Sequence, residues 1–160
     1  MTDIRQTDGR GRFIRYAPLL IWTGVILTLS TGAGSMGRTS FIVGPILNFL
    51  FPTASADTLL FYHALVRKGA HVFEYAVLAL LAMWAFRPSR VAILSKQPYI
   101  SALLLVAAIA VIDEFQQSFH PRRTGSPYAV ALDLTGGMLA LAAVALWRRR
   151  RAVSDFKTSN

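Results

Sequence analysis

The chain has 160 residues and no cysteine, which excludes disulfides, thiolate metal sites and a cysteine nucleophile. Hydrophobic residues make up 54% of the chain and charged residues only 16%, so we exclude an ordinary water-soluble domain and interpret it as an integral membrane protein. The formal net charge of +9 is explained by membrane topology and anionic lipid rather than by nucleic acid, because basic residues flank the apolar segments.

Four apolar segments are long enough to cross a bilayer, which takes about 20 mostly apolar residues per helix. They lie at residues 16–37, 68–86, 98–119 and 126–147. The shorter segment FIVGPILNFLF contains Gly44 and Pro45, so we expect a re-entrant or interfacial segment there, between the first and second spans. We therefore predict an all-α polytopic membrane bundle of four transmembrane helices, with one domain at residues 16–147 between basic tails at 1–15 and 148–160.

The charge distribution predicts the orientation of these spans. Most of the 17 Lys and Arg residues lie before the first span, between the second and third, or after the fourth. The other side holds Arg38, Arg67, Lys68, Arg122 and Arg123. Because Lys and Arg accumulate in cytoplasmic loops, we predict a multi-pass plasma-membrane protein with both termini in the cytoplasm. The first segment could instead be a cleaved secretory signal, since arginines precede it and the small residues TGAGS follow it.

Carboxylates inside or at the rim of the spans are the most informative residues. They are Glu74, Asp113, Glu114 and Asp133. A charged side chain at the bilayer centre costs about 2.5–3.5 kcal/mol, so something must compensate for it. A helical rise of about 1.5 Å per residue places Asp113 about 8 Å below the outer boundary, and Glu74 and Asp133 about 9 and 10 Å below it. Three helices thus carry acids at one level, which predicts a polar pocket near the outer leaflet.

Other polar and small residues lie on the same helix faces as these acids. One face of the second span carries Lys68, His71, Glu74 and Tyr75. On the third span, Asp113 shares a face with Gln116 and Gln117. Gly136 and Gly137 follow Asp133 and would let a neighbouring helix approach closely. Two further histidines are expected in exposed loops, without an assigned role: His63 and His120.

The segments RKGAHVFEYAVLAL and DEFQQSFHPRRTGSPYAVALDLTGG together resemble the VanZ-like family of small bacterial polytopic membrane proteins. The family motifs are matched by Lys68, His71, Glu74, Tyr75, Asp113, Glu114, Gln117, Phe119, Pro121, Arg123, Asp133 and Gly136. The chain departs from them at Arg122, where Gly is usual, and at Ala129, where many members carry another Asp. The resemblance implies a cell-envelope protein of the bacterial inner membrane. Through the family's namesake it also implies a link to low-level resistance to teicoplanin, a glycopeptide antibiotic with a lipid tail.

We interpret the polar cluster as a ligand-binding or functional site, because intramembrane carboxylates at matching depth usually mark one, whereas simple fastening of helices is the competing interpretation. Its candidate residues are Lys68, His71, Glu74, Tyr75, Asp113, Glu114, Gln117, Arg123 and Asp133. No catalytic residue, metal or cofactor is assigned. The expected partners are membrane lipids and a lipid-linked envelope precursor or lipid-tailed glycopeptide, whose phosphate or carboxylate would meet the basic residues at the outer rim.

Two other classes of function stay open at this point. One is an intramembrane hydrolase or transferase with His71 or Glu74 as base, with or without a metal held by Asp113, Glu114 and Asp133. The chain lacks G-x-S-x-G and H-E-x-x-H motifs, which disfavours that class. The other is a proton-coupled carrier that titrates Asp113 and Asp133, which the lack of an inverted repeat disfavours. We therefore favour recognition of an amphiphilic envelope ligand.

Overall fold

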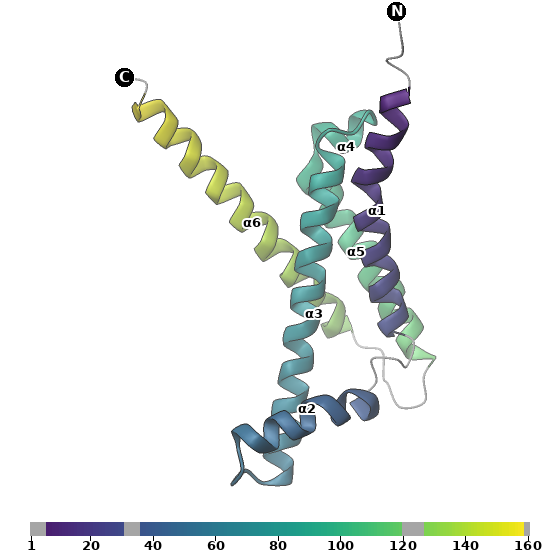
Figure 1. Ribbon diagram of the computed structural model, residues 1–160, viewed down its shortest axis with the longest axis vertical. Helices are drawn as coiled ribbons and strands as arrows, with labels where there is room; N and C mark the ends of the chain where they lie inside the picture. Colours follow the sequence, from purple (N-terminus) through teal and green to yellow (C-terminus); the bar gives the residue numbers. More distant parts are fainter. Residues whose placement is uncertain (1–5, 31–35, 120–126, 159–160) are drawn as a thin grey trace, which may run out of the picture.

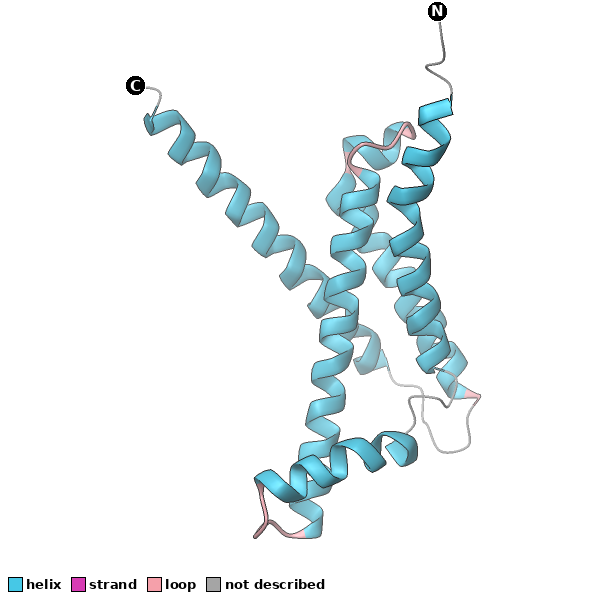
Figure 2. Ribbon diagram, in the orientation of Figure 1, coloured by secondary structure: helices cyan, strands magenta, loops and turns pink. Residues whose placement is uncertain are grey.

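The computed structural model describes residues 6–30, 36–119 and 127–158, and the regular structure of this part of the chain is entirely helical (Figure 2). The helices are α1 (Gln6–Thr28), α2 (Met36–Leu50), α3 (Ala56–Phe86), α4 (Ala92–Lys96), α5 (Pro98–Ser118) and α6 (Pro127–Thr158). The predicted all-α class is thus confirmed for the described residues.

Long apolar helices fit a membrane protein, although fewer of them are found than the sequence predicted. Within the described residues, 3 helices are long and apolar enough to cross a membrane: Ala56–Phe86, Pro98–Ser118 and Tyr128–Ala152. The apolar parts of α1 and α2 are shorter, at Phe13–Thr28 and Thr39–Leu50. Three of the four predicted spans are therefore supported.

Helix α3 is the centre of the bundle and contacts α1, α2, α5 and α6. Figure 1 shows α1 and α5 running alongside α3, while α6 crosses it obliquely and its second half projects from the bundle. The start of α1, the short helix α4 and the end of α6 lie at one end of the molecule, and α2 lies across α3 at the other end (Figure 1). Both described chain ends therefore share a side with the α4 connection.

Helix α3 begins about three turns before the predicted start of the second span. The Ser55 side chain caps it by accepting a hydrogen bond from the Thr58 backbone N–H, and Asp57 in the first turn suits the positive end of the helix dipole. As a result, His63 lies within α3, is 5% exposed, and is hydrogen-bonded through Nε2 to Thr39 Oγ1 of α2 at 3.1 Å. The expectation of an exposed loop histidine at this position was wrong, because packing against α2 buries it.

Helix α2 occupies the segment predicted to be re-entrant or interfacial. It continues past Pro45 to Leu50, so the proline lies inside the helix, where its missing N–H normally bends or interrupts the backbone. The ring of Phe51, just after α2, lies 4.8 Å from the ring of Tyr62 on α3. This contact and the His63–Thr39 hydrogen bond hold α2 across one end of α3, while its location at a membrane surface stays a prediction.

Small residues decide how closely the long helices pack. A Cβ on Gly136 would lie 2.2 Å from the backbone oxygen of Val72, so α6 and α3 touch backbone to backbone. A Cβ on Gly137 would lie 3.1 Å from Cγ1 of Val106 on α5. Close approach through small residues is a common basis of helix association in lipid, where the hydrophobic effect contributes little. The two glycines therefore fix α6 against both neighbours, one turn beyond Asp133.

The outer helices extend into the residues predicted to be tails. Helix α1 starts at Gln6 and α6 runs to Thr158. Arg15 of α1 donates to the Pro88 carbonyl at 2.9 Å, and the Tyr16 hydroxyl lies 3.0 Å from Ser89 Oγ, so α1 is fixed at the α4 end of the bundle. Large hydrophobic side chains remain exposed around the outside of the helices, as expected of surfaces that face lipid.

Candidate functional site

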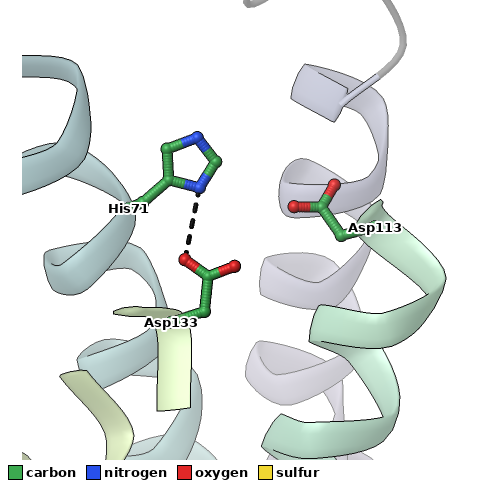
Figure 3. Close-up of side chains that lie close together, drawn as sticks. All are labelled: His71, Asp113 and Asp133. Atoms are coloured by element: carbon green, nitrogen blue, oxygen red, sulfur yellow. Dashed lines mark ion pairs between the residues drawn. The ribbon is translucent and has the colours of Figure 1, made fainter. Parts of the chain in front are cut away.

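A buried polar cluster lies where α3, α5 and α6 meet. Figure 3 shows His71 of α3, Asp113 of α5 and Asp133 of α6 directed toward a common space. His71 Nδ1 lies 3.4 Å from Asp133 Oδ1, which forms an ion pair when the histidine is protonated. Asp113 and Asp133 are each only 1% exposed. Burial of two carboxylates beside one imidazole is costly unless other groups compensate for their charge.

Two neutral donors hold the carboxylate of Asp113 in place. The Tyr75 hydroxyl donates to its Oδ2 at 3.1 Å, and Nε2 of Gln117, one turn further along α5, donates to the same oxygen at 3.1 Å. All three residues are buried. The other oxygen, Oδ1, is buried without a hydrogen-bond partner among the described residues. The carboxylate is thus fixed through one oxygen and presents the other.

The carboxylate of Asp133 has fewer partners than that of Asp113. Neither of its oxygens has a hydrogen-bond partner among the described residues, and the contact with His71 is a longer ion-pair approach. Its position follows from the packing of α6, because Gly136 brings that helix against Val72, the neighbour of His71. Gly136, which permits the close approach of α6 to α3, lies one helical turn after Asp133, which contacts His71.

A pocket of about 400 Å³ opens beside this cluster. Its lining residues are Ala64, Arg67, Lys68, His71, Glu114, Gln117, Tyr128, Ala129, Leu132 and Asp133. A smaller pocket of about 170 Å³ lies toward α1 and α2 and includes Ser30, Thr39 and Glu74. Both pockets share Arg67, His71 and Gln117, so His71 borders both of them.

The structure brings together most of the residues that the sequence singled out. His71, Tyr75, Asp113, Gln117 and Asp133 form the buried cluster. Lys68 is exposed and Glu114 is half-buried, and both line the larger pocket. Glu74 lines the smaller one. Arg123 lies outside the described residues, together with Arg122 and His120.

Several residues near the cluster were not predicted from the sequence. Trp22 of α1 donates from Nε1 to the Glu74 backbone carbonyl at 2.9 Å, and no sequence pattern indicates a bond to a main-chain oxygen. His63 was missed although a signal existed, since His63, Arg67 and His71 recur at intervals of four residues along one helix face. An earlier helix start would have placed all three on that face.

Comparison with known proteins identifies the family of the chain. A family model described as VanZ/LLP1 matches residues 13–148, which include every element of the cluster. No curated protein and no solved structure matches the chain.

Proposed function

Because the chain belongs to the VanZ/LLP1 family, we propose that it recognises the anionic head group of an amphiphile at the pocket between α3, α5 and α6. Membership confirms the resemblance that the motifs predicted. The observation that carries the proposal is the pocket of about 400 Å³, which joins a basic lip of Arg67 and Lys68 to the half-buried His71 and the buried Asp133 between apolar helices. Its size lies within the range of small-molecule sites, about 300–1,000 Å³.

In the proposed topology, α1 crosses the membrane in addition to α3, α5 and α6, which makes four spans. The α4 end of the bundle faces the cytoplasm. Helix α1 lies along α3 and is joined to it by the Trp22 hydrogen bond and by the 1% exposed Ile26, which packs into the core. Arg87, Arg90 and Lys96 cluster at the α4 end, as cytoplasmic loops do. On this proposal both termini lie in the cytoplasm and the protein is in the bacterial inner membrane.

The same topology puts the pocket close to the outer leaflet. The stretch of α3 from Lys68 to its C-cap Arg87 is roughly 28 Å long at about 1.5 Å per residue. This length is close to the hydrocarbon thickness of a bilayer. A head group at this level is reached by a molecule whose tail lies in the outer leaflet. A lipid-linked cell-envelope precursor or a lipid-tailed glycopeptide of the teicoplanin type has this form, and binding of either would link the protein to glycopeptide resistance.

Single cysteines test the topology without background, since the chain has none. A cysteine at Ser55 should react with an impermeant thiol reagent added to intact cells, whereas one at Ser89 should react only after permeabilisation. The reverse pattern would contradict the orientation and the location of the pocket.

Binding is tested with farnesyl phosphate as the probe and the purified full-length protein in nanodiscs. We expect farnesyl phosphate to raise the thermal midpoint of unfolding, because it binds the folded state, and expect farnesol and inorganic phosphate to have much smaller effects. Lys68→Met should remove the stabilisation, since exposed Lys68 lines the pocket. Lys96→Met, at the α4 end, should retain it. If farnesol raised the thermal midpoint as much as farnesyl phosphate did, recognition of the head group would be contradicted. Equal effects of farnesyl phosphate on the midpoints of Lys68→Met and Lys96→Met would contradict it as well.

A further inference from the structure

Three metal-ligating side chains converge from three helices. One nitrogen of His71 and one carboxylate oxygen each of Asp113 and Asp133 all lie within 4.8 Å of one another. Zn²⁺ binds nitrogen and oxygen ligands tetrahedrally at about 2.0–2.2 Å, which sets ligand atoms about 3.4 Å apart. The longest separation among the three atoms would therefore need to shorten by up to about 1.4 Å, which side-chain rotations can provide.

Three carboxylate oxygens around this space have no hydrogen-bond partner among the described residues, and one of them has only the 3.4 Å ion-pair approach of His71 Nδ1 to Asp133 Oδ1. They are Asp113 Oδ1 and both oxygens of Asp133, and all three are buried. Figure 3 shows one oxygen of each carboxylate turned toward the gap between the two side chains, and the nitrogen of His71 that faces Asp133 borders the same gap. Buried carboxylate oxygens without partners are costly, and a cation is the group that satisfies several of them at once.

The hydrogen bonds around the cluster resemble those that orient carboxylate ligands in metal sites. Tyr75 and Gln117 both donate to Asp113 Oδ2, which orients the carboxylate and leaves Oδ1 without a hydrogen-bond partner among the described residues. Hydrogen bonds of this kind to ligating carboxylates are typical of metal sites and tune their affinity. His71 and Asp133 also line the larger pocket, which gives an ion a path to the site.

We infer that His71, Asp113 and Asp133 bind one divalent transition-metal ion, through His71 Nδ1 and one oxygen of each aspartate. One imidazole with two carboxylates suits Zn²⁺ or Mn²⁺, because imidazole favours the first and carboxylates the second. Three protein ligands leave at least one coordination position open toward the pocket. The ion would offset the charge of the two carboxylates, so that an anionic head group could approach them. That last role rests on the proposed function, whereas metal binding itself does not.

The site differs from the metal site weighed in the sequence analysis. There the third ligand was Glu114, which follows Asp113 directly. Successive residues on a helix point about 100° apart, and among the described residues the converging ligand atoms do not include one from Glu114. Within the described residues, His71 takes the third position.

The test uses the full-length protein in detergent, stripped with a chelator, re-equilibrated with Zn²⁺ or Mn²⁺ alone, desalted and analysed for bound metal without added lipid. We expect about one ion per chain for the wild type and at least a tenfold weaker affinity for Asp113→Asn and Asp133→Asn. Asp57→Asn, an exposed acid in the first turn of α3, should bind like the wild type. If neither ion bound to the wild type, or if all three variants lost metal binding equally, the inference would be overturned.

A spectroscopic measurement on the wild type removes dependence on whether the aspartate variants fold. Pulsed electron paramagnetic resonance of the Mn²⁺-loaded protein should detect the nitrogen of one directly bound imidazole, which His71→Gln should abolish. A spectrum without bound nitrogen would contradict the site. Metal binding without any response to farnesyl phosphate would leave this inference standing and contradict the proposed function, and the converse result would do the opposite.

Discussion

On one side of α3, helix α6 lies so close that Gly136 has no room for a Cβ, whereas on the other side α1 and α2 are joined to α3 by hydrogen bonds from single side chains. The first contact is rigid because two backbones meet and neither can give way by changing a rotamer. The second is adaptable, and the smaller pocket lies there, between α1, α2 and α3. Buried Asp133 is found on the rigid side, where small displacements would separate it from His71.

The largest effect is expected from filling the contact between α3 and α6. Gly136→Ala places a methyl group 2.2 Å from the Val72 carbonyl oxygen, so the backbones must separate. We expect a loss of about 3 kcal/mol or more in the free energy of unfolding, at the upper end of what overpacking costs. Unfolding in mixed detergent micelles measures this loss. Gly69→Ala on α3, where a Cβ meets nothing within 4 Å, is the matched control and should not destabilise.

A smaller effect is expected from the hydrogen bond that fixes Asp113. Tyr75→Phe removes one of the two donors to Oδ2 and should cost about 1–2 kcal/mol of unfolding free energy. Combined with Asp113→Asn in a double-mutant cycle, it should show a coupling energy of at least about 0.5 kcal/mol. Tyr16→Phe, whose hydroxyl lies near Ser89 instead, should be additive with Asp113→Asn. Additivity in both cycles would mean that the Tyr75 contact contributes nothing.

The smallest effect is expected on the adaptable side of α3. Trp22→Phe removes the hydrogen bond to the Glu74 carbonyl and should cost about 0.5–1.5 kcal/mol. Trp84→Phe, at a half-exposed position of α3, should change stability by less than about 0.5 kcal/mol. A loss for Trp22→Phe as large as that for Gly136→Ala would remove the distinction between the two sides.

The helical class and most of the cluster followed from the sequence, because hydropathy and the cost of buried charge are local properties of each segment. Asp113 and Asp133 were recognised by their depth in separate spans. His71 was recognised by the helix face that it shares with Glu74, and Gly136 by its spacing from Asp133. Their partners were not predictable, since the Tyr75–Asp113 and His71–Asp133 contacts depend on how the helices rotate against one another. The start of α3 at Ala56 was missed because polar residues such as Arg67 and Lys68 were taken as a boundary, although a long helix tolerates them.

The central claim, that an amphiphile's head group enters the larger pocket, is tested most directly by photocrosslinking from inside it. A photoreactive phenylalanine replaces Tyr128, which lines the pocket and is 87% exposed, or Phe73, which is 64% exposed on α3 and does not line it. A tagged farnesyl phosphate should crosslink at position 128, and excess untagged farnesyl phosphate, but not farnesol, should suppress that product. Any product at position 73 should resist competition. Products at both positions that respond alike to the competitors would contradict the account.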